Sequence, residues 1–146
     1  MNADAEGRLI VADALAYMQK NFKVAKIVDL ATLGTVTAML GNVYAGLFSN
    51  DEKLTKTLIF AGEKSGERLW HLPIDDDYEK MIKSDVADMK NISTQSARVT
   101  SVAFLNKFIE KNTKWAHIDV SGLRLDKTGL SSGFGVKLLN QLMKDL

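Results

Sequence analysis

Strand-like and helix-like segments alternate along the chain, and this alternation restricts the possible folds more than any other feature. A run rich in β-branched residues predicts a strand over 26–33, and further strands are expected over 43–48, 87–92 and 115–120. Apolar residues at helical spacing predict helices over 9–22, 36–40, 52–64, 75–81, 99–109 and from 136 onward. This order predicts an α/β fold, with a mixed, largely parallel sheet and helices on both of its faces. Sites in such folds gather at the carboxyl ends of the strands.

The chain is expected to form one domain, 1–146, because its 146 residues contain no internal repeat, low-complexity tract or linker. Lysine and arginine number 19 against 18 acidic residues, so the net charge of +1 gives no electrostatic reason to expect nucleic acid or a membrane surface as partner. Cysteine is absent, which excludes thiol catalysis and disulfides. No long apolar run or signal pattern occurs, and we expect a cytoplasmic protein.

The first eight residues carry the most suggestive chemistry. Asp4 and Glu6 stand one residue apart, and Gly7 and Arg8 follow directly before a helical pattern. In an extended segment, side chains two positions apart point to the same side, so both carboxylates would be able to hold a cation or a pair of cations. The alternative is the start of a helix, where acidic residues complement the helix dipole and cap free amides. Both interpretations remain open from these residues alone.

Other candidate residues have simpler interpretations. His71 and His117 are possible acid–base groups, but each lies in an apolar, tryptophan-containing segment that is typical of a core. The methionines are scattered at core-like positions and do not suggest a soft-metal site. The short pattern Gly133-Phe134-Gly135 is better explained by helix entry than by phosphate binding.

Residues 2–8 resemble the Asn-Thr-Asp-Ala-Glu-Gly-Arg signature of the leucyl (cytosol) aminopeptidase family, which consists of two-metal exopeptidases with an α/β catalytic domain. Further segments resemble family blocks in family order, namely 29–33, 45–50, 66–70, 84–91 and 115–119. The resemblance extends over essentially the whole chain and corresponds to the carboxy-terminal part of that catalytic domain.

The resemblance implies a hydrolase that removes amino-terminal residues from peptides. Its cofactors would be two divalent ions, zinc, manganese or magnesium, with a bicarbonate as proton shuttle. By position in the motif, Asp4 and Glu6 match metal ligands, and Arg8 matches the catalytic arginine that holds the bicarbonate. Asn2, Ala5, Thr32 and Gly34 fall in segments that bind substrate.

The family's remaining metal ligands, a lysine and two aspartates, and a second catalytic lysine precede this signature. We therefore expect a truncated aminopeptidase-like domain, inactive as an isolated chain, because two carboxylates alone offer a hard cation too few donors. The expected partners are further copies, since the family is hexameric, or a separate upstream catalytic fragment. The alternative is a folded remnant with a structural or assembly role. Metal identity and substrate preference do not follow from the sequence.

Overall fold

The computed structural model describes residues 3–34, 36–93 and 97–145, without the side chains of residues 3, 4, 97 and 98. Its ten elements run along the chain in an order close to the expected alternation. They are α1 (Ala3–Asn21), β1 (Lys26–Ala31), α2 (Thr37–Leu40), β2 (Ala45–Ser49), α3 (Glu52–Ser65), β3 (Leu69–His71), α4 (Asp76–Lys80), α5 (Ala97–Asn106), β4 (Lys114–Asp119) and α6 (Val136–Asp145).

The four strands form one mixed sheet in the order β1-β4-β2-β3. β1 runs parallel to β4 and β2 runs parallel to β3, whereas β2 and β4 are antiparallel. β1 therefore lies at one edge of the sheet. Its neighbour is β4, the last strand in the sequence, and β2 and β3 lie beyond β4. The α/β class and the largely parallel sheet are confirmed.

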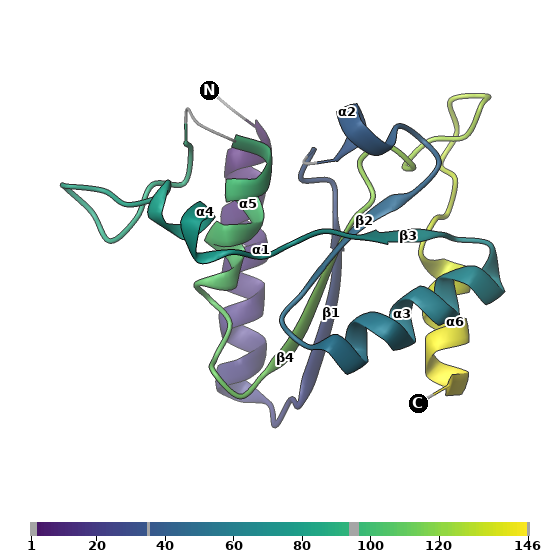
Figure 1. Ribbon diagram of the computed structural model, residues 1–146, viewed down its shortest axis with the longest axis horizontal. Coiled ribbons are helices and arrows are strands. Elements are labelled where there is room, and N and C mark those ends of the chain that lie inside the picture. The colour runs from purple at the N-terminus through teal and green to yellow at the C-terminus, as the bar shows by residue number, and fades with distance from the viewer. Residues whose placement is uncertain (1–2, 35, 94–96, 146) are drawn as a thin grey trace.

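Helices cover both faces of the sheet, with α1, α4 and α5 on one side and α3 and α6 on the other (Figure 1). Alternation along β4 explains the two cores, because Trp115 packs with Ala12 and Leu15 of α1, whereas Ile118 packs with Leu58 of α3 and Leu138 of α6. Burial on both faces accounts for the nearly continuous apolar character of β2 and β4.

The boundaries of α3 show how local residues define an element. Asp51 caps the helix, since its Oδ1 accepts a hydrogen bond of 2.7 Å from the backbone N–H of Leu54. Gly66 ends the helix in the left-handed conformation, with φ of +76°, which glycine adopts without steric cost. At the far edge of the sheet, the exposed ring of Trp70 in β3 packs edge to face on Tyr44, with ring centroids 5.7 Å apart.

Three expectations about the elements need correction. The segment 87–92, expected as a strand, lies outside the sheet and is irregular, and its backbone is tied instead by a 2.7 Å bond from the N–H of Lys90 to the carbonyl of Ile82. The short strand β3 was not expected, because residues 69–73 end in a proline that favours a boundary. The first helix begins at Ala3 rather than at residue 9, so the backbone of residues 4–8 is helical and not extended, whereas the expected metal-ligand role of Asp4 and Glu6 stays a prediction.

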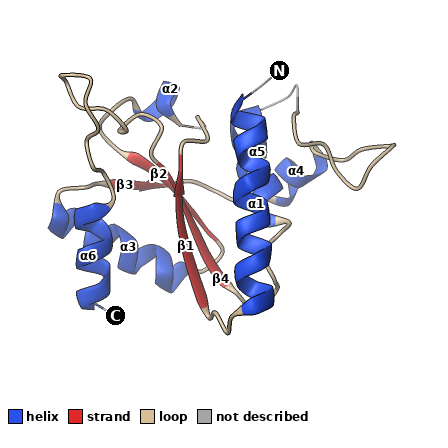
Figure 2. Cartoon of the chain, turned by 180° about the vertical axis from the view of Figure 1, so that it is seen from behind, coloured by secondary structure: helices blue, strands red, loops and turns tan. Residues whose placement is uncertain are grey.

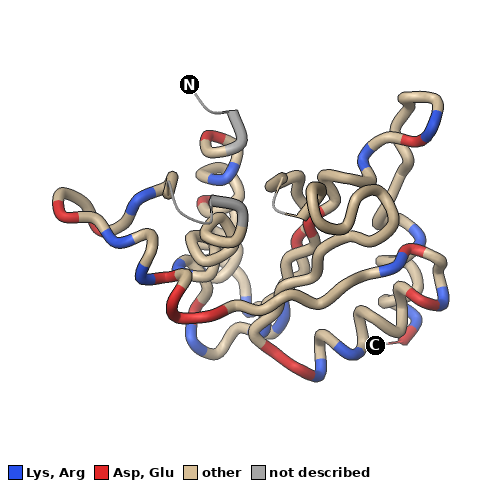
Figure 3. Tube along the Cα trace, turned by 45° about the horizontal axis from the view of Figure 1, so that its top comes forward, with Lys and Arg blue, Asp and Glu red and all other residues tan. Residues whose placement is uncertain are grey.

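Acidic and basic residues are interspersed along the described chain, as Figure 3 shows, in keeping with its near-neutral balance. Among the described residues, no helix is both long and apolar enough to cross a membrane.

Candidate active site

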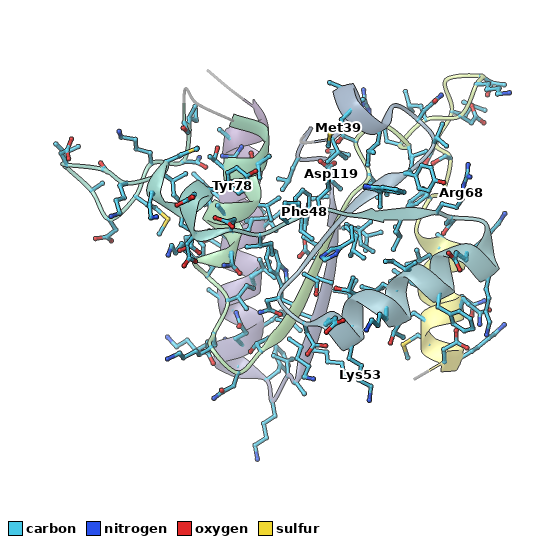
Figure 4. All side chains as sticks on the ribbon, in the orientation of Figure 1. Met39, Phe48, Lys53, Arg68, Tyr78 and Asp119 are labelled. Atoms are coloured by element: carbon cyan, nitrogen blue, oxygen red, sulfur yellow. The ribbon has the colours of Figure 1, made fainter. Side chains whose placement is uncertain are left out.

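The first turns of α1 and the carboxyl ends of β1 and β4 lie at the same end of the molecule, the upper end in Figure 1. A pocket of about 380 Å³ opens between them. Its lining comes from α1, from the end of β1 and its following loop, and from the residue after β4: Gly7, Arg8, Val11, Leu30, Ala31, Thr32, Leu33 and Val120. Asp119, the last residue of β4, lies at this same end in Figure 4. This is the position at which α/β sheets usually bind ligands.

Arg8 brings a charged group to the lining of the pocket. Its side chain is buried, and Nη1 donates to both Oδ1 of Asn91, at 3.1 Å, and the backbone carbonyl of Asn91. The Asn91 amide in turn donates to the carbonyl of Ala5 at 2.6 Å. Asn91 therefore connects the irregular segment after α4 to the first turn of α1 and holds the guanidinium in one orientation.

A second polar group forms where β4 ends. The Asp119 carboxylate accepts hydrogen bonds from the backbone N–H of Ser121, at 3.0 Å, and from its hydroxyl. The hydroxyl oxygen of Ser121 also accepts a bond of 3.1 Å from the N–H of Gly34. Gly34 has φ of +71°, in the region that favours glycine. The loop after β1 is thereby fixed to the turn after β4.

The structure brings together some of the residues that the sequence analysis singled out. Arg8 and Thr32 both line the pocket, and Ala5 is buried in the same turn of α1. Gly34 lies two residues beyond Thr32 and bonds to Ser121, as described above. Glu6 is exposed on α1. Asn2 and the side chain of Asp4 lie outside the described part of the chain, so their expected roles stay predictions.

The described side chains do not form a metal site by themselves. In the described ranges, no three histidine, aspartate or glutamate side chains lie close enough together to hold an ion. Divalent ions such as Mg²⁺ and Mn²⁺ need about six oxygen donors, and Glu6 is the only described side chain of the two expected ligands. Any metal centre at this end of the sheet therefore requires donors beyond those that the structure describes.

The two histidines have different environments. His117 is fully buried, and its Nδ1 lies 2.6 Å from Oδ1 of Asp29, whose Oδ2 accepts a 2.6 Å bond from the indole N–H of Trp115. This arrangement supports the core interpretation of His117, since Asp29 joins two side chains of β4 to β1. His71 is exposed on β3, so the expected core position is wrong for that residue.

Carboxyl groups with a lowered pKa lie away from the pocket. The Leu54 N–H, followed by Lys114, holds the pKa of Asp51 below its ordinary value, and the Thr128 hydroxyl and backbone N–H groups do the same for the pKa of Asp126. Both residues stabilise local structure, a helix start and a turn, and neither belongs to the candidate site.

Sequence reasoning missed Asn91 and Ser121. Asn91 stood in a segment expected as a strand, and Ser121 directly follows another such segment. A signal was present for Ser121, because an aspartate followed two residues later by a serine often forms a local side-chain turn. No local signal marks Asn91, whose partners lie 83 and 86 residues away in the chain.

The fold defined by these elements is that of one part of an aminopeptidase. A mutant of tomato leucine aminopeptidase superposes with a TM-score of 0.93 at 38% identity, over 99% of this chain and 29% of the tomato chain.

The sequence gives the particular family. Residues 1–140 match the catalytic domain of the cytosol aminopeptidase family. A probable cytosol aminopeptidase of Chlorobaculum tepidum is 50% identical, over 98% of this chain and 30% of that protein. One from Ehrlichia ruminantium is 47% identical, over 98% of this chain and 31% of that protein. The chain belongs to the cytosol aminopeptidase family, and it spans about 30% of the length of these relatives.

Proposed function

We propose that this chain contributes one part of the active site of a two-metal aminopeptidase, which removes amino-terminal residues from peptides. Asp4 and Glu6 are proposed as metal ligands and Arg8 as the catalytic arginine. When bound, the two ions, zinc, manganese or magnesium, supply an activated water and a contact for the free amine of the substrate. The family membership and the position of the pocket support this assignment.

The observation that carries the proposal is the placement of Arg8. Arg8 lines the pocket at the carboxyl ends of the strands together with Thr32 and Leu33, although these residues are far from it in sequence. A planar guanidinium binds planar oxyanions through paired hydrogen bonds, which suits a bicarbonate that relays protons. The anchoring by Asn91 removes much of the freedom that such binding would otherwise cost.

Substrate binding is assigned to two segments. Asn2 and Ala5 belong to the motif that contains Arg8, and Thr32 and Gly34 to the loop after β1. The bond from Gly34 to Ser121 keeps this loop beside the end of β4, as contacts to a substrate backbone would require. The remaining donors would come from further copies of the chain or from another part of a catalytic domain.

Hydrolysis of leucyl amide tests the proposal. We expect no release of leucine by the chain alone. With the Chlorobaculum tepidum relative from which the matching segment has been removed, we expect hydrolysis that manganese supports and chelation abolishes. Arg8→Ala should lower kcat by about 100-fold in this mixture, the typical contribution of proton transfer, and Asp4→Ala should abolish the hydrolysis that manganese supports.

The matched control is Lys20→Ala, an exposed residue in the last turn of α1, which should leave kcat unchanged. Metal-dependent hydrolysis by the purified chain alone would show that no further donors are needed, and would overturn that part of the proposal.

A non-catalytic role in structure or assembly is the second candidate. It is favoured by the lack of a metal-binding group among the described side chains. A mixture that forms a stable complex, binds metal and still hydrolyses no leucyl amide would support this role and contradict the catalytic one.

A further inference from the structure

We propose that a pocket beside α4 binds a small zwitterion with an apolar side chain, which is the chemistry of a free amino acid or of a short peptide with free ends. We call it the α4 pocket. It has a volume of about 440 Å³ and is formed by α4, by the irregular segment that follows this helix and by Lys107 after α5. It shares no lining residue with the pocket that contains Arg8, so binding here does not depend on the proposed function.

The floor of the α4 pocket is apolar and is held by the backbone. Ile82 is only 2% exposed, and Met89 packs against the same core cluster. The N–H of Lys90 donates a 2.7 Å hydrogen bond to the carbonyl of Ile82, which closes the base of a loop. Residues 83–90 extend from this base beside α4 (Figure 2). An aliphatic side chain of a ligand that lies on this floor is removed from water, which favours its binding.

The rim of the α4 pocket is charged and electrically balanced. It carries three carboxylates and three ammonium groups, namely those of Asp76, Glu79, Asp88, Lys80, Lys83 and Lys107. Figure 3 shows acidic and basic residues interspersed along α4 and the loop that follows it. Equal numbers of both charges favour a ligand that carries one of each over a plain anion or a plain cation.

Half of these charged groups already have partners. Glu79 pairs with Lys107, and Lys80 pairs with Asp77 on the exposed side of α4. The other three side chains make no hydrogen bond or ion pair with any described residue, and they are those of Asp76, Lys83 and Asp88. The α4 pocket therefore offers two free carboxylates to the ammonium group of a ligand and one free ammonium to its carboxylate.

The size and the donor set of the α4 pocket exclude two other kinds of ligand. In the described ranges, no three acidic or histidine side chains lie close enough together to hold a metal ion, and the lysines at the rim would repel one. A volume of about 440 Å³ is typical of sites for small molecules and is too small for a folded partner. An amino acid or a dipeptide fits both the volume and the charges.

The experiment titrates the purified chain with L-leucine and follows the amide chemical shifts by NMR. We expect saturable shifts at Ile82 and Met89 and none at Thr32 and Leu33, which line the other pocket. Leucine amide lacks the carboxylate and N-acetylleucine lacks the ammonium, so each should bind about threefold more weakly, as for the loss of one exposed ion pair. Glycine should also bind more weakly, because it has no side chain for the floor.

Leucylleucine distinguishes the two sources of the same chemistry. Tighter binding than that of leucine would identify a short peptide as the ligand, and weaker binding would identify a free amino acid. Either result, together with the losses for the amide and the acetylated form, supports a site for zwitterions.

Variants of the rim assign each charge to its partner. Asp76→Asn combined with Asp88→Asn should weaken leucine and leucine amide by at least about threefold and leave N-acetylleucine unchanged, because only the first two carry an ammonium. Lys83→Gln should weaken leucine and N-acetylleucine and leave leucine amide unchanged. The matched controls are Asp85→Asn and Lys90→Gln, which should change no affinity, since both residues are exposed in the same segment and neither lines the α4 pocket.

A second format keeps the measurement possible if the separate chain does not fold. This sequence replaces the matching segment of the Chlorobaculum tepidum relative, a chelator prevents hydrolysis of the amide, and hydrogen exchange at residues 82–89 takes the place of chemical shifts. No saturable change at Ile82 and Met89 in either format would overturn the inference. Equal affinities for leucine, leucine amide and N-acetylleucine, or changes confined to Thr32 and Leu33, would also overturn it.

Discussion

Asn91 is the residue whose role differs most from its expectation. It satisfies a buried guanidinium and a backbone carbonyl of α1 at once. Removing such a group leaves both partners without that bond inside the protein, which costs more than the bond itself contributes.

Asn91→Ala should therefore lower the free energy of unfolding by about 2 kcal/mol, the range for hydrogen bonds to a charged group. Urea denaturation measures the change. Asn21→Ala is the matched control, because the Asn21 amide bonds only within the exposed end of α1, to the carbonyl of Tyr17. A loss at position 91 no larger than that at position 21 would contradict the anchoring role.

Single residues also show where sequence reasoning succeeds and where it stops. Asp51 and Gly66 flank the helix expected over 52–64, and both cap α3, because capping depends on neighbours within a few residues. The irregular course of residues 87–92 was not expected, because apolar and polar residues alternate there as they would in a strand. The same alternation suits a loop in which Met89 packs on the core and Asn91 bonds to α1. Contacts between distant segments decide such cases.

At the level of helices and strands, two glycines in similar positions have opposite expected effects. A glycine inside a helix normally costs stability relative to alanine. A Cβ at Gly62 in α3 would lie 2.7 Å from the backbone carbonyl of Glu67, whereas a Cβ at Gly7 in α1 would meet nothing within 4 Å.

Gly7→Ala should raise the free energy of unfolding by about 0.5 to 1 kcal/mol, and Gly62→Ala should lower it by about 1 to 3 kcal/mol, as in other overpacked sites. Thermal denaturation of both variants checks the pair. Stabilisation by both substitutions would contradict the prediction for Gly62, because it would show that the Glu67 backbone moves away from the added methyl group at little cost.

The start of α3 should make stability depend on pH. The Leu54 N–H and Lys114 lower the pKa of Asp51 in the folded state, so this contribution is complete above its ordinary value of 3.8 and is lost as the pH falls through the lower, folded value. Asp51→Asn keeps a neutral cap but not this dependence. Urea midpoints at pH 6 and pH 3 should show the wild type more stable at pH 6, with a smaller difference between the two proteins at pH 3. An equal difference at both pH values would contradict the assignment.

The elements themselves were largely foreseen, because amphipathic periodicity and β-branched runs are local properties. The position of β2 between β4 and β3, and its antiparallel pairing with β4, were not foreseen. Register and strand order depend on which strand faces are buried together. A single sequence does not show which strands become neighbours. For the site, the expected Arg8 and Thr32 do meet in one pocket. The groups that bond to Arg8 and to Gly34, namely Asn91 and Ser121, became visible only in three dimensions.

For the molecule as a whole, packing is uneven. The sheet and its two helical layers enclose the cores, whereas residues 83–90 extend from the edge of the α4–α5 side (Figure 1), and Val86 is almost fully exposed. Exposed, irregular backbone of this kind is the preferred target of proteases.

Limited digestion with trypsin should therefore cut first after Lys83 or Lys90, before the equally exposed lysines Lys53 and Lys56 inside α3, since helical backbone must unfold locally to be cleaved. Mass spectrometry of the early fragments identifies the site. First cleavage within α3 would contradict this expectation, because it would mean that the helix unfolds locally more readily than residues 83–90 are cut.

The two tryptophans occupy opposite extremes of this architecture. Trp115 has no exposed surface and donates a hydrogen bond from its indole N–H to Asp29, whereas Trp70 is 54% exposed on the edge strand β3. Their fluorescence should consequently divide into two parts, one that emits at long wavelength and is quenched by iodide, and one that emits at short wavelength and is shielded. A single unlabelled sample would thus report edge and interior separately, and the order in which the two signals change during unfolding would reveal whether the strand edge frays before the core opens.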